Sequence, residues 1–348
     1  MSSPGELLGE QLSGGFDVYI GWREIRDAKG RFALISGVIA LLSLMVVMLS
    51  ALTSGLDAES TSAVRALPGD TVITQAAAGG EASSLTDSRV DDAAVGHVRD
   101  DDPQATVLGV ATTRVTADGR AAAAAAFGFS DTDEVTVDSE TAASLGLSAG
   151  STVVVGTEKV RVDDVADTGK YAHTPVIRMP YSTWVSATGR DAASAVLTAA
   201  ASAPGGMVAT SHGDAVSLVP GYKSEHSSLL LIQGLLLAIS AIVVCGFFAV
   251  WTGQRVRSLA VVRAMGAGRN YLIRDGLGQA AVVLFAGLLA GGGVGAIGAA
   301  IASGTVPIAF DAWSMIALLA GMAVLGLAGA AVALRPLVKV DPLTALNR

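Results

Sequence analysis

The chain has 348 residues, of which 51% are hydrophobic and only 16% are charged. This composition is too apolar for a soluble globular protein of this length, and it indicates a membrane protein with a soluble portion. The net charge of −8 is unevenly distributed, because residues 57–228 hold 23 acidic side chains against 11 lysines and arginines. That acidic region argues against nucleic acid as a partner. The single cysteine, Cys245, excludes a disulfide within one chain.

The first segment, residues 1–31, is predicted to lie in the cytoplasm. It lacks the basic stretch and apolar core of a cleavable signal peptide, and its second half mixes Phe16, Tyr19 and Trp22 with arginines and lysines. That pattern is typical of an amphipathic helix on the membrane surface. The alternative is a basic flank that only orients the helix after it.

Four charge-free stretches predict membrane-spanning helices, at residues 32–56, 229–253, 277–302 and 312–334. Each is long enough for a bilayer, which needs about 20 apolar residues. Lysines and arginines before the first span, in residues 254–275 and in residues 335–348 predict a multi-pass protein of the plasma membrane with both termini in the cytoplasm. The third span carries Gly287, Gly291 and Gly295, a small-residue face that permits close helix packing.

The segment between the first two spans, residues 57–228, is predicted to be an extracellular mixed α/β domain. Stretches such as TVITQAA from Thr71, ATVLGVATTRVT from Ala105 and AAAAAFGF from Ala122 are typical of strands separated by turns. The stretch from Glu134 onward predicts a strand, a short helix that ends at Gly146, and a hairpin. The acidic run at residues 100–102 is a solvated turn or a weak cation site. The predicted fold is therefore an α-helical membrane protein with four transmembrane helices and an extracellular α/β domain between the first two.

Catalytic motifs are missing from the sequence. It contains no G-x-x-x-x-G-K-[ST] or H-E-x-x-H, and its four histidines, His97, His173, His212 and His226, follow no ligand spacing. The predicted spans carry no ionisable residue, which argues against a proton-coupled carrier or an ion pump. We therefore predict a non-catalytic chain, without an intrinsic cofactor or metal, that takes its energy from a partner.

Four motifs on this layout resemble the FtsX/MacB-type permeases of ABC transporters. They are GWREIRDAKGRFAL (Gly21–Leu34), DSETAASLGLSAGSTVVVG (Asp138–Gly156), RSLAVVRAMGAGRNYLIR (Arg257–Arg274) and KVDPLTALNR (Lys339–Arg348). The second motif departs from the family pattern by carrying Ser151 in place of the usual aspartate. Together they cover the entry to the first span, part of the outer domain, the basic loop and the C-terminal tail.

The resemblance implies a permease homodimer in a lipid membrane that works with two copies of a separate ABC ATPase, which binds the ATP. In that family the segment after the second span, here residues 254–275, docks on the ATPase. The residues that match this role are Arg257, Leu259, Val262, Arg263, Met265, Gly266 and Arg269. Their apolar members offer an edge to bury, and their arginines can pair with acidic groups of the partner. The alternative is a loop held only by lipid phosphates.

In size and layout the chain most resembles haem-efflux permeases of the HrtB type, which implies export of haem or a similar amphipathic molecule. The candidate haem contacts, as iron ligands or propionate partners, are Met45, Met48, Glu59, Tyr222 and His226. The alternative for the methionines is an ordinary role in the span, and for Glu59 a solvated charge. Two other functions stay open. One is export of a lipid, peptide or antibiotic; the other is FtsX-like mechanical signalling to a cell-wall hydrolase, which requires an exposed apolar patch on the outer domain.

Overall fold

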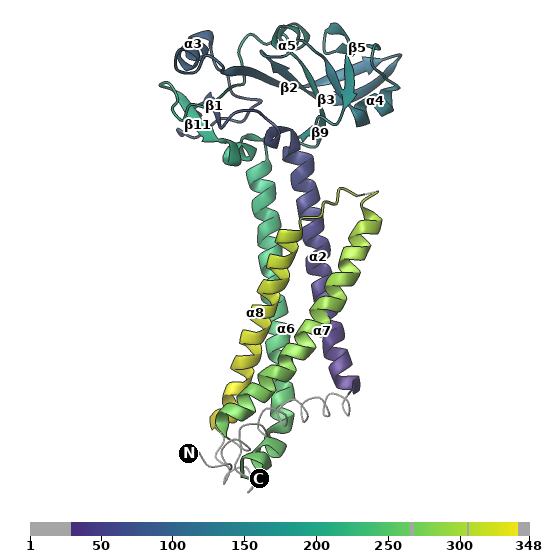
Figure 1. Ribbon diagram of the computed structural model, residues 1–348, viewed down its shortest axis with the longest axis vertical. Coiled ribbons are helices and arrows are strands. Elements are labelled where there is room, and N and C mark those ends of the chain that lie inside the picture. The colour runs from purple at the N-terminus through teal and green to yellow at the C-terminus, as the bar shows by residue number, and fades with distance from the viewer. Residues whose placement is uncertain (1–28, 265–267, 305, 340–348) are drawn as a thin grey trace, which may run out of the picture. The chain divides into compact units, whose positions relative to one another are not determined.

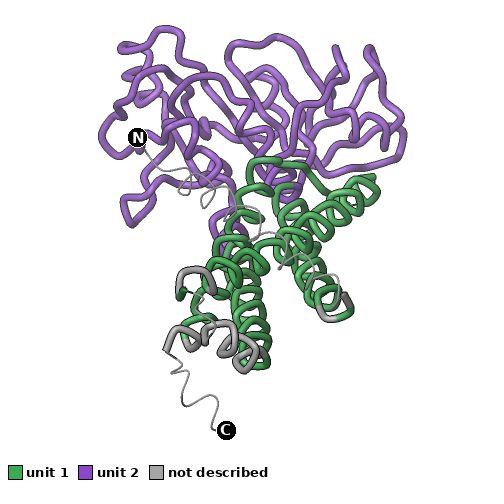
Figure 2. The backbone as a smooth tube through the Cα atoms, turned by 60° about the horizontal axis from the view of Figure 1, so that its bottom comes forward, with its two compact units in different colours: residues 1–54, 229–348 green, residues 55–228 purple. Residues whose placement is uncertain are grey.

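The computed structural model describes residues 29–264, 268–304 and 306–339. The chain divides into two compact units, shown in different colours in Figure 2: unit 1 comprises Met1–Ser54 and Leu229–Arg348, and unit 2 comprises Gly55–Ser228. The predicted amphipathic segment lies almost wholly outside the described residues, as does the C-terminal tail from residue 340 onward.

Unit 1 is built from four long helices (Figure 1). They are α2 (Lys29–Arg65), α6 (Tyr222–Ala264), α7 (Arg269–Ala302) and α8 (Ala312–Lys339). Each is long and apolar enough to cross a membrane. The four predicted spans lie within these helices, and α2 and α6 each continue into the residues of unit 2.

Helix α7 packs its glycine face closely against α2. A methyl group added to Gly291 would collide with the carbonyl oxygen of Ala40, and one added to Gly287 would lie 2.7 Å from Cβ of Ile39. The Ser43 hydroxyl donates to the carbonyl oxygen of Leu288 at 3.1 Å, which adds a polar bond across the same interface. The small-residue face predicted from the sequence therefore has α2 as its partner.

Helices α2 and α6 also meet within unit 1. The Phe32 ring lies edge-on to Trp251 with centroids 5.8 Å apart, and Trp251 in turn packs edge-on against Phe248. Elsewhere along the pair, the Gln233 side-chain amide donates to the Thr53 hydroxyl at 3.0 Å. Because an unpaired amide is costly among apolar side chains, this bond gives the polar group of Gln233 a partner.

Unit 2 is a mixed α/β domain built on one large sheet. Its strands are β1 (Thr71–Gln75), β2 (Thr106–Ala117), β3 (Arg120–Phe129), β4 (Thr136–Asp138), β5 (Thr152–Val155), β6 (Glu158–Arg161), β7 (Asp164–Ala166), β8 (Lys170–Tyr171), β9 (Thr174–Pro180), β10 (Ala195–Thr198) and β11 (Met207–Ser211). The main order is β11-β1-β10-β2-β3-β9-β4-β7, with β5 joined to β2 and β8 to β9. Neighbours are antiparallel except the parallel pairs β3–β9 and β4–β7.

Short helices complete unit 2: α3 (Asp92–Asp101), α4 (Ser139–Leu145), α5 (Tyr181–Thr188) and the 3₁₀ helix η1 (His212–Leu218). Trp184 of α5 is fully buried against β2 and β3, where Gly109 and Gly128 leave room for its ring. Its indole N–H donates to the carbonyl oxygen of Ala126 at 3.1 Å. Two glycines on adjacent strands thus make the depression that holds the largest buried side chain of the domain.

The predicted elements of this domain are largely confirmed. Strands β1, β2 and β3 lie where the sequence predicts them, and α4 is capped by Gly146 with φ at 72°, as the predicted helix end requires. The predicted hairpin is β5–β6. The expected fold class, four apolar helices with a mixed α/β domain between the first and second, is confirmed.

Candidate functional site: the helix–sheet junction of unit 2

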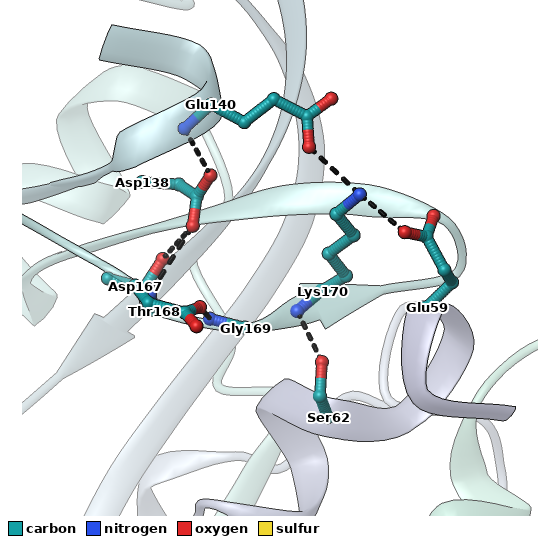
Figure 3. Close-up of polar contacts among 8 residues, drawn as sticks. All are labelled: Glu59, Ser62, Asp138, Glu140, Asp167, Thr168, Gly169 and Lys170. Carbon is teal, nitrogen blue, oxygen red and sulfur yellow. Dashed lines mark hydrogen bonds and ion pairs between the residues drawn. The ribbon is translucent and has the colours of Figure 1, made fainter. Parts of the chain in front are cut away.

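A short hairpin binds the end of α2 to the sheet of unit 2 (Figure 3). We call residues 169–174, which join β8 to β9, the docking hairpin. Three of its backbone amides donate to one stretch of α2: Lys170 to the Ser62 hydroxyl at 2.8 Å, Ala172 to the Ser60 carbonyl at 3.0 Å, and His173 to the Glu59 carbonyl at 3.1 Å. Main-chain groups therefore hold the hairpin on the helix.

Gly169 makes this close contact possible. Its φ is +78°, and an added Cβ would lie 2.9 Å from the backbone nitrogen of Ala63. Any other residue would meet both a strained backbone and the helix backbone of α2. A glycine is therefore required at this position for the hairpin to reach α2.

The tip of the docking hairpin is strained. Ala172 and His173 have φ of 46° and 62°, the left-handed region that residues other than glycine adopt uncommonly and that alanine adopts less often than histidine. A two-residue turn of this kind normally carries Asn-Gly, so the sequence Ala-His gave no signal for it. Strain of this kind persists only where the surroundings hold the backbone in place, and here both residues donate to carbonyls of α2.

Lys170 lies between two glutamates from different elements. Its Nζ is 2.6 Å from Oε1 of Glu59 on α2 and 2.8 Å from Oε2 of Glu140 on α4 (Figure 3). Partial burial by itself lowers the pKa of Lys170, but the hydrogen bonds to Glu140 and Glu59 and their negative charges outweigh it, so the pKa is raised above its ordinary value. Lys170 is thus charged at neutral pH and joins three elements.

The loop before the hairpin is tied to α4 through a buried acid. Asp138, only 4% exposed, accepts from the Glu140 amide at the start of α4 at 2.9 Å. It also accepts from the amide and hydroxyl of Thr168, and that hydroxyl lies 2.6 Å from the carbonyl oxygen of Val176. The start of α4, the loop and β9 therefore form one hydrogen-bonded network beside Lys170.

The first residues of α6 within unit 2, Tyr222–Ser228, also reach this hairpin. We call them the α6 entry. Nε2 of His173 lies 3.3 Å from Oε2 of Glu225, and the rings of Tyr222 and His226 stack with centroids 5.2 Å apart. His173 is the side chain of the docking hairpin that contacts α6.

The predicted haem contacts lie in both units. In unit 1, Met45 is 49% exposed on α2, whereas Met48 is half-buried with its sulfur beside Gly298 of α7. In unit 2, Tyr222 and His226 are brought together, and Glu59 is held by Lys170 rather than standing as a free charge. This last contact could not be predicted from the sequence, because the two residues are 111 positions apart.

The predicted ATPase-docking residues are divided between two helices. Helix α6 continues unbroken to Ala264 and therefore includes Arg257, Leu259, Val262 and Arg263, while Arg269 is the first residue of α7. Met265 and Gly266 lie outside the described residues.

The acidic run at residues 100–102 has a structural role. Asp102 ends α3, accepts from the Thr198 hydroxyl at 2.6 Å and from the Ala199 amide at 3.0 Å, and so ties the helix to β10. These bonds, with a third from the Gln104 amide, lower the pKa of Asp102. Among the described residues, no group of three or more His, Cys, Asp or Glu side chains could hold a metal ion.

Comparison with known families concerns chiefly α6, α7 and α8. Residues 230–342 match the family described as FtsX-like permease C-terminal. The chain therefore carries an FtsX-like permease domain. The resemblance to FtsX/MacB-type permeases predicted from the sequence is confirmed by this match.

Two relatives come from strains of Staphylococcus epidermidis, and both are provisionally named hemin transport system permease protein HrtB. One is 26% identical over 142 residues, which is 41% of this chain and 41% of the relative. The other is 27% identical over 131 residues, or 38% of this chain and 37% of the relative. The matched region thus spans only about two fifths of the relatives' own length.

Among solved structures, the periplasmic region of MacB from Actinobacillus actinomycetemcomitans resembles this chain with a TM-score of 0.29 and 12% identity. The match covers 52% of this chain and 89% of that structure. A likeness at this level supports no conclusion about shared fold or function.

Proposed function

We propose that this FtsX-like permease is the membrane subunit of an ABC-type efflux transporter. The match of residues 230–342 to FtsX-like permeases carries the proposal, and four helices apolar enough to span a membrane are consistent with it. ATP hydrolysis is assigned to a separate ATPase, in two copies under a permease homodimer. The basic residues at the end of α6 and the start of α7 are the proposed docking segment.

We place the protein in the plasma membrane with both termini in the cytoplasm and unit 2 outside the cell. Three basic segments support this topology: Lys29 and Arg31 begin α2, arginines occupy residues 254–275, and Arg335 and Lys339 end α8. The acidic composition of residues 57–228 agrees with an exposed domain on the opposite side.

The surface of unit 2 favours transport over mechanical signalling. Activation of a cell-wall hydrolase requires an apolar docking patch. Within residues 55–228, all of which the structure describes, no large apolar side chain is exposed; those that are exposed belong to unit 1. This polar surface argues against the signalling alternative.

We propose haem, or a similar amphipathic molecule, as the substrate, supported by the similarity to the two hemin permeases. Of the five candidate contacts, Tyr222 and His226 carry most weight because their rings lie together at the α6 entry. Glu59 ranks lower because Lys170 already pairs with it, and Met48 because it packs beside Gly298. Export of another lipid, peptide or antibiotic is the alternative that the experiment below separates.

The test is a haem titration of the purified permease with its ATPase, in which Soret absorbance and the rate of ATP hydrolysis are both recorded. We expect a Soret shift with a stimulated ATPase, and we expect His226→Gln or Tyr222→Phe to weaken haem affinity about tenfold, since losing one ligand costs ~1.4 kcal/mol or more.

His97→Gln is the matched control for this titration. His97 lies on α3, where its Nδ1 donates to the Ala93 carbonyl at 2.7 Å. We expect this variant to bind haem as the wild type does. A titration in which neither absorbance nor ATPase rate responds would remove haem as the substrate and leave the permease proposal standing.

A further inference from the structure

The docking hairpin contacts α2 and the α6 entry in different ways. On α2 it uses three backbone amides and the paired side chain of Lys170. Gly169 lies so close to Ala63 that no side chain fits between them. Breaking one of these bonds leaves a main-chain group without a partner while the other bonds still hold the hairpin. The hairpin can therefore leave α2 only if all of the bonds break together.

The α6 entry, by contrast, is attached to the rest of unit 2 through side chains. Its main-chain bonds stay local, with the Tyr222 amide donating to Val219 and the Glu225 amide to Gly221. Tyr222 packs against the buried cluster that also holds Ala63 and Val64 of α2, and its hydroxyl hydrogen-bonds to the carboxylate of Asp57 on α2. The polar side-chain contacts are the His173–Glu225 hydrogen bond at 3.3 Å, with side chains 45% and 35% exposed, and the Lys223–Glu81 ion pair at 3.8 Å, which is still more exposed.

Exposed polar side-chain contacts of this kind change an equilibrium constant by about fivefold at most. The contact of His173 with Glu225 can therefore break without disturbing the sheet. The contacts of the same hairpin with α2 cannot. The strained backbone at Ala172 and His173 agrees with this difference, because the α2 carbonyls hold both residues in place whether or not the His173 side chain has a partner.

We propose that the docking hairpin is a one-sided latch: it fixes α2 to the sheet of unit 2, and opening of the His173–Glu225 contact frees the helical turn of the α6 entry that follows Tyr222, while Tyr222 itself stays bound to α2. The two helix ends within unit 2 would then differ in mobility. The end of α2 would stay fixed to the sheet, whereas the α6 entry could move relative to it. As a step in ATP-driven transport the latch rests on the proposed function, but its mechanical asymmetry does not.

The test is amide hydrogen exchange, read by mass spectrometry, on the full chain in lipid nanodiscs without an ATPase. Glu225→Gln should raise exchange in residues 222–228 about threefold and leave residues 59–65 and 170–176 unchanged. Glu158→Gln is the matched control, because Glu158 lies on β6 and makes no ion pair within unit 2. It should change none of the three segments.

A second variant tests the fixed side. Lys170→Met removes both glutamate contacts and should raise exchange about fivefold in residues 59–65 and 170–176 together, since these segments open as one. The latch is overturned if Glu225→Gln loosens α2 and the hairpin as much as the α6 entry, or if it loosens none of them. Because no ATPase or substrate is present, either result is independent of whether the protein transports haem.

Discussion

The two units differ in which side chains they bury and which they expose. In unit 1 many large apolar side chains are exposed, among them Leu289, Ile301 and Trp313, while the contact between α2 and α7 is made by glycines and hydroxyls. In unit 2 no large apolar side chain is exposed, and the interior holds Trp184, Tyr171 and Phe127. Apolar surface drives packing where water is the solvent, but it has no such effect against lipid, where close approach of small residues takes over.

The largest expected effect tests this contrast with two tryptophans. Trp184→Ala should lower the free energy of unfolding of unit 2 by about 3–5 kcal/mol, because it empties a buried site and leaves the Ala126 carbonyl without its donor. Trp313→Ala, on the exposed face of α8, should change stability by about 0.5 kcal/mol or less. Thermal and chemical unfolding of the full chain in detergent, followed by circular dichroism, measures both. Equal losses would contradict the comparison.

The glycine face of α7 gives the next largest effect. Gly291→Ala should destabilise unit 1 by about 1–3 kcal/mol, because the new methyl group meets the backbone of Ala40 and the helices must separate. Gly293, two positions on, faces open space, and Gly293→Ala should cost nothing. Unfolding of the two variants in mixed micelles compares them directly. Should Gly293→Ala prove as harmful, lipid contact would matter more than the α2–α7 approach, since alanine favours a helix more than glycine does.

The smallest effect concerns Lys170 and its dependence on pH. Lys170→Met should lower the stability of unit 2 by about 1 kcal/mol at neutral pH, since Glu59 and Glu140 lose their shared partner. The folded pKa of Lys170 lies above the unfolded value of about 10.4, so its contribution is complete below that pH and disappears as pH rises through the folded pKa.

The difference in stability between wild type and Lys170→Met should therefore be constant from neutral pH to about pH 10 and shrink above it. Lys159→Met is the control, because Lys159 is exposed on β6 and forms no ion pair within unit 2. A difference that does not change at alkaline pH would show that Lys170 stabilises the junction by packing alone.

Much of the architecture could be predicted from local patterns. Charge-free runs predict the four long helices because only a bilayer tolerates so many adjacent apolar residues. Strands β1–β3 follow from apolar runs bounded by turn residues, and the helix that ends at Gly146 follows from a glycine cap. The glycines of α7 were identified as a packing face, but their partner α2 could not be named, because spacing on one helix says nothing about which other helix approaches it.

The candidate site was predicted less well, for a physical reason. Glu59 was expected to be solvated or to meet a ligand, and it is instead paired with Lys170. The docking hairpin has no Asn-Gly signal, because its unusual backbone is held by α2 and not by its own residues.

The sequence by itself determined that this protein has four membrane-compatible helices, a mixed α/β domain between the first two, and the features of an FtsX-like permease. Each of those properties follows from runs and repeats of residues that are neighbours in the sequence. The tertiary structure decided which helix receives the glycine face of α7, how Trp184 is accommodated, and that a strained hairpin joins the sheet to α2 and α6. Those features depend on hydrogen bonds, ion pairs and close contacts between residues far apart in the chain, whose partners only folding brings together.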